Sequence, residues 1–122
     1  MSSSDGNKPE MRRFPRFNRS MLVNMITENS TCHGRTIDVS ERGARIATRK
    51  PFPVGEKINL ELYLRDTDPF PIRLVGECRW SRTEHHEAVT GVDFAGSKSH
   101  SLAVLRAYIS QATASDSETS PS

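Results

Sequence analysis

The chain has 122 residues, a length that fits one domain and excludes multi-domain machinery. Only 34% of the residues are hydrophobic, no apolar run approaches the roughly 18 residues that cross a bilayer, and the first ten residues are polar rather than signal-like, so we expect a cytoplasmic protein. The net charge is +2, but residues 8–50 carry ten basic and four acidic side chains, and 13 of the 17 basic residues are arginine. This bias favours a phosphate or nucleotide partner, and a solvated basic surface accounts for it equally well.

Short runs of β-forming residues alternate with turn clusters through most of the chain. The fourth run is the clearest, because apolar and polar residues alternate through residues 58–65 and give the strand one inward and one outward face. The fifth run repeats this alternation, with Trp80 in phase with Cys78 and the apolar residues before it. The six predicted strands are residues 20–27, 32–39, 44–48, 58–65, 72–80 and 88–94.

The hydrophobic period changes after the last predicted strand. Apolar residues recur there at helical spacing, which predicts one C-terminal helix over residues 97–112 with Ser97 or Ser99 as its N-cap. The short links between strands favour an antiparallel sheet, closed or nearly closed into a small barrel over residues 20–96. The expected fold is therefore all-β, a six-stranded antiparallel barrel with the helix over one open end.

Both ends of the chain are expected to be flexible. Residues 1–10 form a polar lead and residues 113–122 a polar tail, and neither offers apolar surface to offset the entropy of ordering. Between the lead and the first strand, residues 11–19 contain a cluster of arginines: Arg12, Arg13 and Arg16. Pro15 disfavours a helix at the residue before it, so we expect this segment to be extended and to close as a flap over an anion.

A second polar cluster follows across the first predicted hairpin. Asp38 and Ser40 are two residues apart at a strand end and are expected to point to the same side, while Gly43 permits a positive φ or a close approach of the chain. A guanine nucleotide suits this set, because a carboxylate accepts from ring N–H groups and arginine binds the O6/N7 edge or a phosphate. Taken alone, the flap also fits a solvated arm, and the segment from Asp38 to Gly43 fits an Asx-type turn.

Together and in this order the two clusters resemble the PilZ domain, the bacterial receptor family for cyclic di-GMP. The family motif R-x-x-x-R is matched from Arg12 to Arg16, and [DN]-x-S-x-x-G is matched from Asp38 to Gly43. The residues around Trp80 resemble the family strand that ends in an aromatic residue, and those before Phe94 resemble its G-[VI]-x-F strand. The resemblance covers residues 11–112 and implies the same six-stranded antiparallel barrel with a C-terminal helix.

The resemblance also implies roles for individual residues. Arg12 and Arg16 are expected to clamp phosphate and guanine with help from Arg13, and the opposing side of the site is expected to comprise Asp38, Ser40 and Gly43. Trp80, the only tryptophan, occupies the position of a family aromatic that lies against a guanine, and a place in the core or at its rim explains it equally well. Met11 adds no further cation, which favours one bound cyclic di-GMP over an intercalated pair.

The remaining polar residues predict no metal site and no catalytic site. The cysteines and histidines lack the paired short spacings of a zinc site, and Cys32 and Cys78 are expected to be reduced core residues. His85 and His86 are expected in an exposed hairpin loop. Because the chain has neither a phosphate-cradling glycine loop nor a hydrolytic carboxylate pair, we expect a non-enzyme without a cofactor.

Two functions from different classes remain open. In the first, the chain is a cyclic di-GMP receptor whose flap closes over the ligand and signals to an unidentified protein partner, with motility, polysaccharide or adhesion control as the outputs that the resemblance implies. In the second, a small barrel binds single-stranded nucleic acid through the arginine-rich segment, with Phe14 and Phe17 as stacking platforms.

Overall fold

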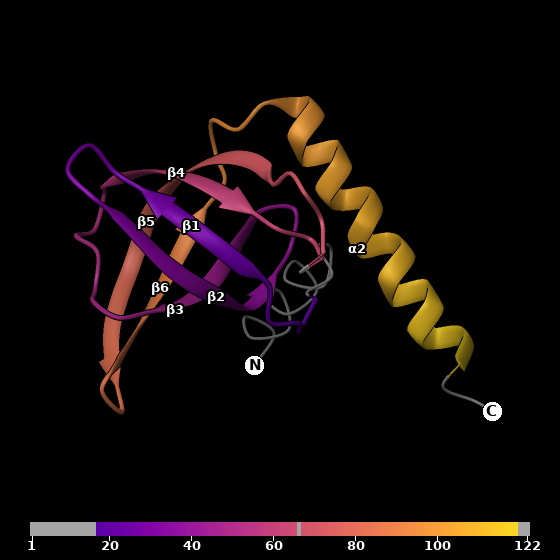
Figure 1. Ribbon diagram of the computed structural model, residues 1–122, viewed down its shortest axis with the longest axis horizontal. Helices are drawn as coiled ribbons and strands as arrows, with labels where there is room; N and C mark the ends of the chain where they lie inside the picture. Colours follow the sequence, from indigo (N-terminus) through magenta and orange to yellow (C-terminus); the bar gives the residue numbers. More distant parts are fainter. Residues whose placement is uncertain (1–16, 66, 120–122) are drawn as a thin grey trace, which may run out of the picture.

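Six antiparallel strands form a closed barrel, and one helix packs against it (Figure 1). The computed structural model describes residues 17–65 and 67–119. The elements are β1 (Leu22–Ile26), β2 (Thr31–Val39), β3 (Gly43–Thr48), β4 (Lys57–Leu62), β5 (Ile72–Glu84), β6 (Glu87–Asp93) and α2 (Ser99–Thr119). The predicted all-β fold, with six strands in a closed barrel and a C-terminal helix, is confirmed.

The barrel consists of two three-stranded meanders, β1-β2-β3 and β4-β5-β6. Within each meander, strands that follow one another in the chain pair with one another. Two seams join the meanders: β1 pairs with β4, and β3 pairs with β6. Because the strand order closes on itself, none of the described strands presents a free edge to another chain.

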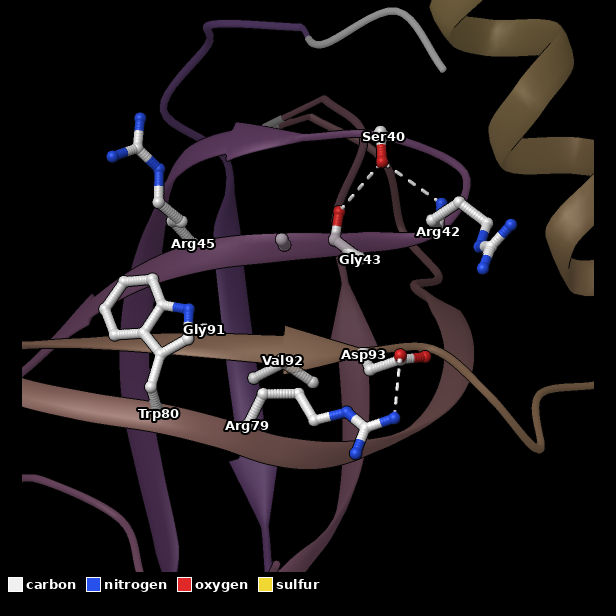
Figure 2. A pocket seen from close by; sticks show the side chains of 10 residues that line it. Ser40, Arg42, Gly43, Arg45, Arg79, Trp80, Gly91, Val92 and Asp93 are labelled. Carbon is white, nitrogen blue, oxygen red and sulfur yellow. Dashed lines mark hydrogen bonds and ion pairs between the residues drawn. The ribbon is translucent and has the colours of Figure 1, made fainter. Parts of the chain in front are cut away.

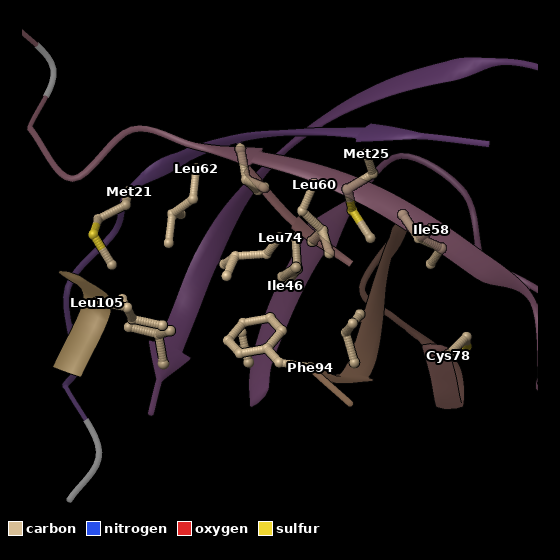
Figure 3. Packing of buried hydrophobic residues seen from close by; sticks show 14 of the residues in the cluster. Met21, Met25, Ile46, Ile58, Leu60, Leu62, Leu74, Cys78, Phe94 and Leu105 are labelled. Carbon is tan, nitrogen blue, oxygen red and sulfur yellow. The ribbon is translucent and has the colours of Figure 1, made fainter. Parts of the chain in front are cut away.

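The core fills the barrel with the inward-facing side chains of all six strands (Figure 3). Met25, Ile46, Ile58, Leu60 and Leu74 are each at most 2% exposed. Burying an aliphatic side chain of this kind contributes about 1.5–3 kcal/mol each, so the alternating pattern of the strands accounts for much of the stability of the fold.

The helix α2 closes one end of the barrel. Leu105 and Ile109 are buried in the same cluster as the strand residues, which confirms the predicted apolar stripe. The Tyr108 hydroxyl donates a hydrogen bond to the carbonyl oxygen of Leu64 at 3.2 Å. The edge of the Phe17 ring meets the Tyr108 ring, with 5.6 Å between centroids and 87° between planes. The helix is thus attached both to the chain before β1 and to the chain after β4.

Most element ends differ from the predictions by one or two residues, and β4 ends at Leu62, three residues earlier than predicted. The helix and β5 differ more. The helix continues to Thr119 instead of ending at residue 112, because the first strong stop signal after that point is Pro121. Ser97 does not cap the helix: its hydroxyl donates to the carbonyl oxygen of Val75 on β5 at 2.7 Å. Strand β5 runs on past Trp80 to Glu84.

The extended β5 leads into a two-residue turn of His85 and His86, whose φ angles are 50° and 70°. Both residues are exposed, so the predicted exposed hairpin loop is confirmed.

Candidate functional site

A shallow groove of about 240 Å³, here called the ligand groove, lies on the outer face of the barrel across the seam between β3 and β6 (Figure 2). The β2–β3 turn, β3, β5 and β6 all contribute to its lining. Its polar and aromatic side chains are Ser40, Arg42, Arg45, Arg79, Trp80 and Asp93. Three arginines against one aspartate make the groove positive, which suits an anionic ligand.

The β2–β3 turn is held by Ser40 and closes against β6 at Gly43. The backbone N–H of Ser40 donates to the carbonyl oxygen of Gly43 at 2.8 Å, and the Ser40 hydroxyl accepts from the backbone N–H of Arg42 at 3.1 Å. A Cβ atom at Gly43 would lie 2.3 Å from the carbonyl oxygen of Val92. Of the two reasons predicted for this glycine, close approach is therefore the one that applies, and its φ is not positive.

A β-bulge in β2 brings Asp38 beside Arg45. The register passes from Thr36 opposite Ile46 to Asp38 opposite Arg45, so Ile37 is the extra residue. Arg45 donates to Asp38 Oδ2 from Nε at 2.9 Å and from Nη2 at 2.5 Å. These hydrogen bonds raise the pKa of Arg45, which keeps the guanidinium charged.

Asp38 acts on the ligand groove through this arginine. Its side chain is 3% exposed and is not part of the lining, whereas that of Arg45 is 41% exposed and is. The carboxylate therefore holds a cation at a fixed place in the groove, a role that the sequence did not suggest.

A second bulge turns Trp80 out of the barrel. Cys78 pairs with Val92 and Trp80 pairs with Gly91, which leaves Arg79 as the extra residue of β5. Arg79 and Trp80 consequently both line the ligand groove, while Cys78 is fully buried. The predicted phase, with Trp80 on the same face as Cys78, is wrong because alternation assumes an unbroken ladder.

The Trp80 ring lies over Gly91, where the strand offers only bare backbone (Figure 2). A Cβ atom at Gly91 would lie 2.3 Å from Cε2 of the ring. The Arg82 guanidinium carbon is 5.0 Å from the ring centroid. The guanidinium therefore lies over the ring in a cation–π contact, and a nucleobase that stacks on Trp80 would share or replace this contact.

The family model of the PilZ domain matches residues 10–111. The chain belongs to the PilZ domain family. This family comprises receptors for cyclic di-GMP.

Three solved structures share the PilZ fold with this chain. The Bacillus subtilis inhibitor of motility MotI/DgrA has a TM-score of 0.72 and 14% identity, covering 85% of this chain and 52% of that one. The PilZ domain of YcgR from Escherichia coli, solved with c-di-GMP, has a TM-score of 0.61 and 14% identity, covering 89% and 97%. A tetrameric PilZ protein of Xanthomonas campestris, self-assembled through a helical bundle, has a TM-score of 0.59 and 17% identity, covering 71% and 47%. The chain thus spans about half the length of the first and third of these proteins. The comparison with curated protein sequences found no match.

The arginines of the first PilZ motif, Arg12, Arg13 and Arg16, lie outside the described residues. The described chain begins at Phe17, which forms a β-bridge to Val39: each backbone N–H donates to the other residue's carbonyl oxygen, at 2.7 and 3.1 Å. Phe17 is only 5% exposed. The bridge therefore joins the arginine segment to the barrel next to Asp38, and burial removes Phe17 as a stacking platform.

Sequence reasoning missed several residues of this PilZ groove. Arg45 could have been found by alternation, because it follows Gly43 by two residues on an outward phase. Arg79 and Gly91 could not have been found in this way. Arg79 reaches the groove because of the β5 bulge, and Gly91 belongs to the groove because the Trp80 ring packs on it. Asp93 accepts from Arg79 Nη2 at 3.4 Å, which ties the two sides of the groove together.

No metal-binding group is found in the part of the PilZ domain that the structure describes: no three His, Cys, Asp or Glu side chains are grouped to hold an ion. Cys32 and Cys78 are both free and buried, as expected. None of the described helical residues forms a segment long and apolar enough to span a bilayer.

Proposed function

We propose that this PilZ domain is a cytoplasmic receptor that binds cyclic di-GMP without turning it over and passes the signal to a protein partner. The observation that carries the proposal is the outward Trp80 ring next to Arg45, which the buried Asp38 holds in place. The aromatic face suits a guanine, and the fixed guanidinium suits a phosphate or the O6/N7 edge. The E. coli YcgR domain of the same fold was solved with c-di-GMP, which supports the choice of ligand.

Arg12, Arg13 and Arg16 would supply the remaining cations. Their segment enters the barrel at the bridge between Phe17 and Val39, so it is tethered beside the Asp38–Gly43 motif. Met11 in front of the first arginine favours one bound ligand per chain. Asp38, Ser40, Gly43 and Trp80 complete the proposed site.

A route for the signal runs to α2 through two contacts. Arg106 Nη1 lies 3.5 Å from Glu41 Oε1, which links the helix to the turn that carries Ser40. Phe17 packs against Tyr108, which links the helix to the end of the arginine segment. A ligand that moves either the turn or the segment would change how α2 is held.

Calorimetric titration with cyclic di-GMP tests the proposal. We expect one ligand per chain at micromolar affinity or better, and we expect Arg12→Ala and Arg16→Ala each to weaken binding by at least ~2 kcal/mol, the scale of a lost charge-assisted contact. Arg73→Ala is the matched control, because Arg73 is 79% exposed and lies outside the groove. Thermal unfolding should show that all three variants remain folded.

The single-stranded nucleic acid alternative makes the opposite prediction. An oligonucleotide titrated over a salt series would bind tightly and lose affinity steeply as salt rises if the arginine segment were a nucleic-acid arm. The burial of Phe17 already argues against it. Tight oligonucleotide binding without cyclic di-GMP binding, or wild-type affinity in both arginine variants, would contradict the proposal.

A further inference from the structure

A second groove, of about 480 Å³, lies on the outer face of the barrel over β1, β2, β3 and the β5–β6 hairpin. It is here called the hairpin groove. Leu22, Gly34, Ala47, Arg35, Arg49 and His86 are among its lining residues. The two grooves share no lining residue, so binding in the ligand groove does not account for the hairpin groove.

Small residues form the floor of the hairpin groove. Gly34 has no side chain, and a Cβ atom there would lie 2.7 Å from the carbonyl oxygen of Ala47, so β2 and β3 approach each other closely. Leu22 on β1 is 39% exposed and supplies an apolar side. The result is a shallow channel of bare backbone with one exposed aliphatic residue beside it, a shape that accepts an extended chain.

The rim of the hairpin groove is basic. Its cations are Arg35 and Arg49, and Glu87 is the one acidic residue of the lining, to which His33 and His86 also belong. Arg35 Nη1 donates to Ser20 Oγ at 3.0 Å, and His33 Nδ1 lies 2.6 Å from Asn24 Oδ1, so two of these side chains are held in place. The complement of such a rim is an acidic partner.

Exposure of the cations decides what kind of anion fits. Arg35 and Arg49 are both solvent-exposed, and water and salt screen an exposed ion pair, so a small anion would gain little from either of them. An extended peptide can contact both arginines and Leu22 at once. The closed barrel offers no strand edge for backbone pairing, so recognition must use these side chains.

We propose that the hairpin groove docks an extended acidic segment of a protein partner, with one apolar side chain of that segment against Leu22. Along β3, Ala47 follows Arg45 by two residues and Arg49 follows Ala47 by two, so this surface continues from the ligand groove. The hairpin groove would give the partner a place to bind. This proposal rests on the proposed function only for the partner's role in signalling.

The test measures docking in the absence of cyclic di-GMP, so that its failure is separate from failure of the ligand assignment. The probe is a short fluorescein-labelled peptide of Asp and Glu with one central leucine, followed by fluorescence anisotropy. Arg49→Glu should weaken binding by about tenfold or more, because it replaces an attractive charge with a repulsive one. The control Arg73→Glu reverses another exposed arginine, which lies outside both grooves and pairs with Glu61 at 3.8 Å, and it should change affinity for the peptide less than twofold.

Leu22→Ser probes the apolar contact independently of charge. It should weaken the leucine-containing peptide severalfold and leave a peptide with serine in place of leucine unchanged. Thermal unfolding of each variant checks the fold. Equal loss in Arg49→Glu and Arg73→Glu, binding of a lysine peptide as tight as that of the acidic one, or preference of this surface for a single-stranded oligonucleotide would each overturn the proposal.

Discussion

At the scale of single residues, two bulges decide which side chains reach the ligand groove. Side chains on a strand alternate with a period of two, so one extra residue moves every residue beyond it to the opposite face. Ile37 does this in β2, bringing Asp38 level with Arg45, and Arg79 does it in β5, bringing Trp80 out of the core. Deleting either residue would redirect a side chain of the site.

Gly91→Ala should displace the Trp80 ring. The new Cβ would lie 2.3 Å from the ring, and a rotamer change is the only way to relieve the clash without moving the strand. Trp80 is the only tryptophan, so its emission reports this directly. We expect a red shift, as the ring moves into water, and affinity for cyclic di-GMP lower by about 1–2 kcal/mol, the worth of one base-stacking contact.

Gly55→Ala is the matched control for that variant. Gly55 has φ near +90° with nothing within 4 Å of a new Cβ, so alanine there strains the backbone without touching Trp80. It should lower the free energy of unfolding by about 1–2 kcal/mol and leave both emission and affinity unchanged. Wild-type emission in Gly91→Ala would show that the ring does not depend on the glycine.

Cys78 adds a pH-dependent contribution to stability. Burial raises the pKa of its thiol, and nearby Glu56 acts in the same direction. Below the unfolded pKa of about 8.5 the thiol is neutral in both states and the stability is complete. Above it the unfolded chain ionises first, so the free energy of unfolding falls as pH rises toward the folded pKa.

Urea unfolding across this alkaline range, with Cys78→Ala as comparison, measures the effect. The variant is expected to be less stable at neutral pH, because it leaves a cavity, but to lose less stability as pH rises. Parallel slopes for the two proteins would assign the alkaline loss to other groups.

At the scale of elements, the turn of the β5–β6 hairpin has residues that its backbone geometry disfavours. Two-residue hairpin turns with positive φ at both positions favour Asn-Gly. In this chain the two positions are occupied by His85 and His86, whose φ angles are 50° and 70°. His85→Asn with His86→Gly should raise the free energy of unfolding by about 1 kcal/mol.

His86→Ala separates the backbone effect from loss of the imidazole. Alanine tolerates positive φ no better than histidine, so this variant should gain nothing. Chemical denaturation measures both proteins. Equal stability of the double variant His85→Asn with His86→Gly and of His86→Ala would mean that the left-handed backbone costs little in this turn.

The elements themselves were largely predictable, and the site was only partly so. Alternation over residues 58–65 and helical spacing around Leu105 depend on local pattern, which survives in any fold that buries one face. The bulges at Ile37 and Arg79 depend on the partner strand, which no local pattern encodes. For the same reason the motif predicted Asp38 next to the site but not its contact with Arg45.

At the end of α2, the sequence predicted less regular structure than the chain has. Residues 113–119 lack apolar anchors, which predicted disorder, yet they continue a helix that is already nucleated. Extending an existing helix costs far less free energy than nucleating a new one. Composition alone does not show whether a segment follows a helix that has already formed.

At the scale of the whole molecule, the ligand groove belongs to neither meander alone. Arg45 comes from β3, whereas Arg79 and Trp80 come from β5 and Gly91 from β6. The groove exists only where the seam between β3 and β6 is closed. A ligand bound there holds the two halves of the barrel together, in addition to contacting its own side chains.

The two-meander order of the barrel also has a consequence for how the chain folds. Contacts within each meander join neighbours in sequence and can form early, whereas the β3–β6 and β1–β4 seams must close long stretches of chain and carry a larger loop entropy. We therefore expect closure of the seams to be the late step that limits the folding rate. The proposed binding of cyclic di-GMP needs the finished β3–β6 seam, because the groove is lined from both of these strands. On that proposal, a newly synthesised chain gains a complete binding site only at the last stage of folding, and no half-folded species competes for the ligand.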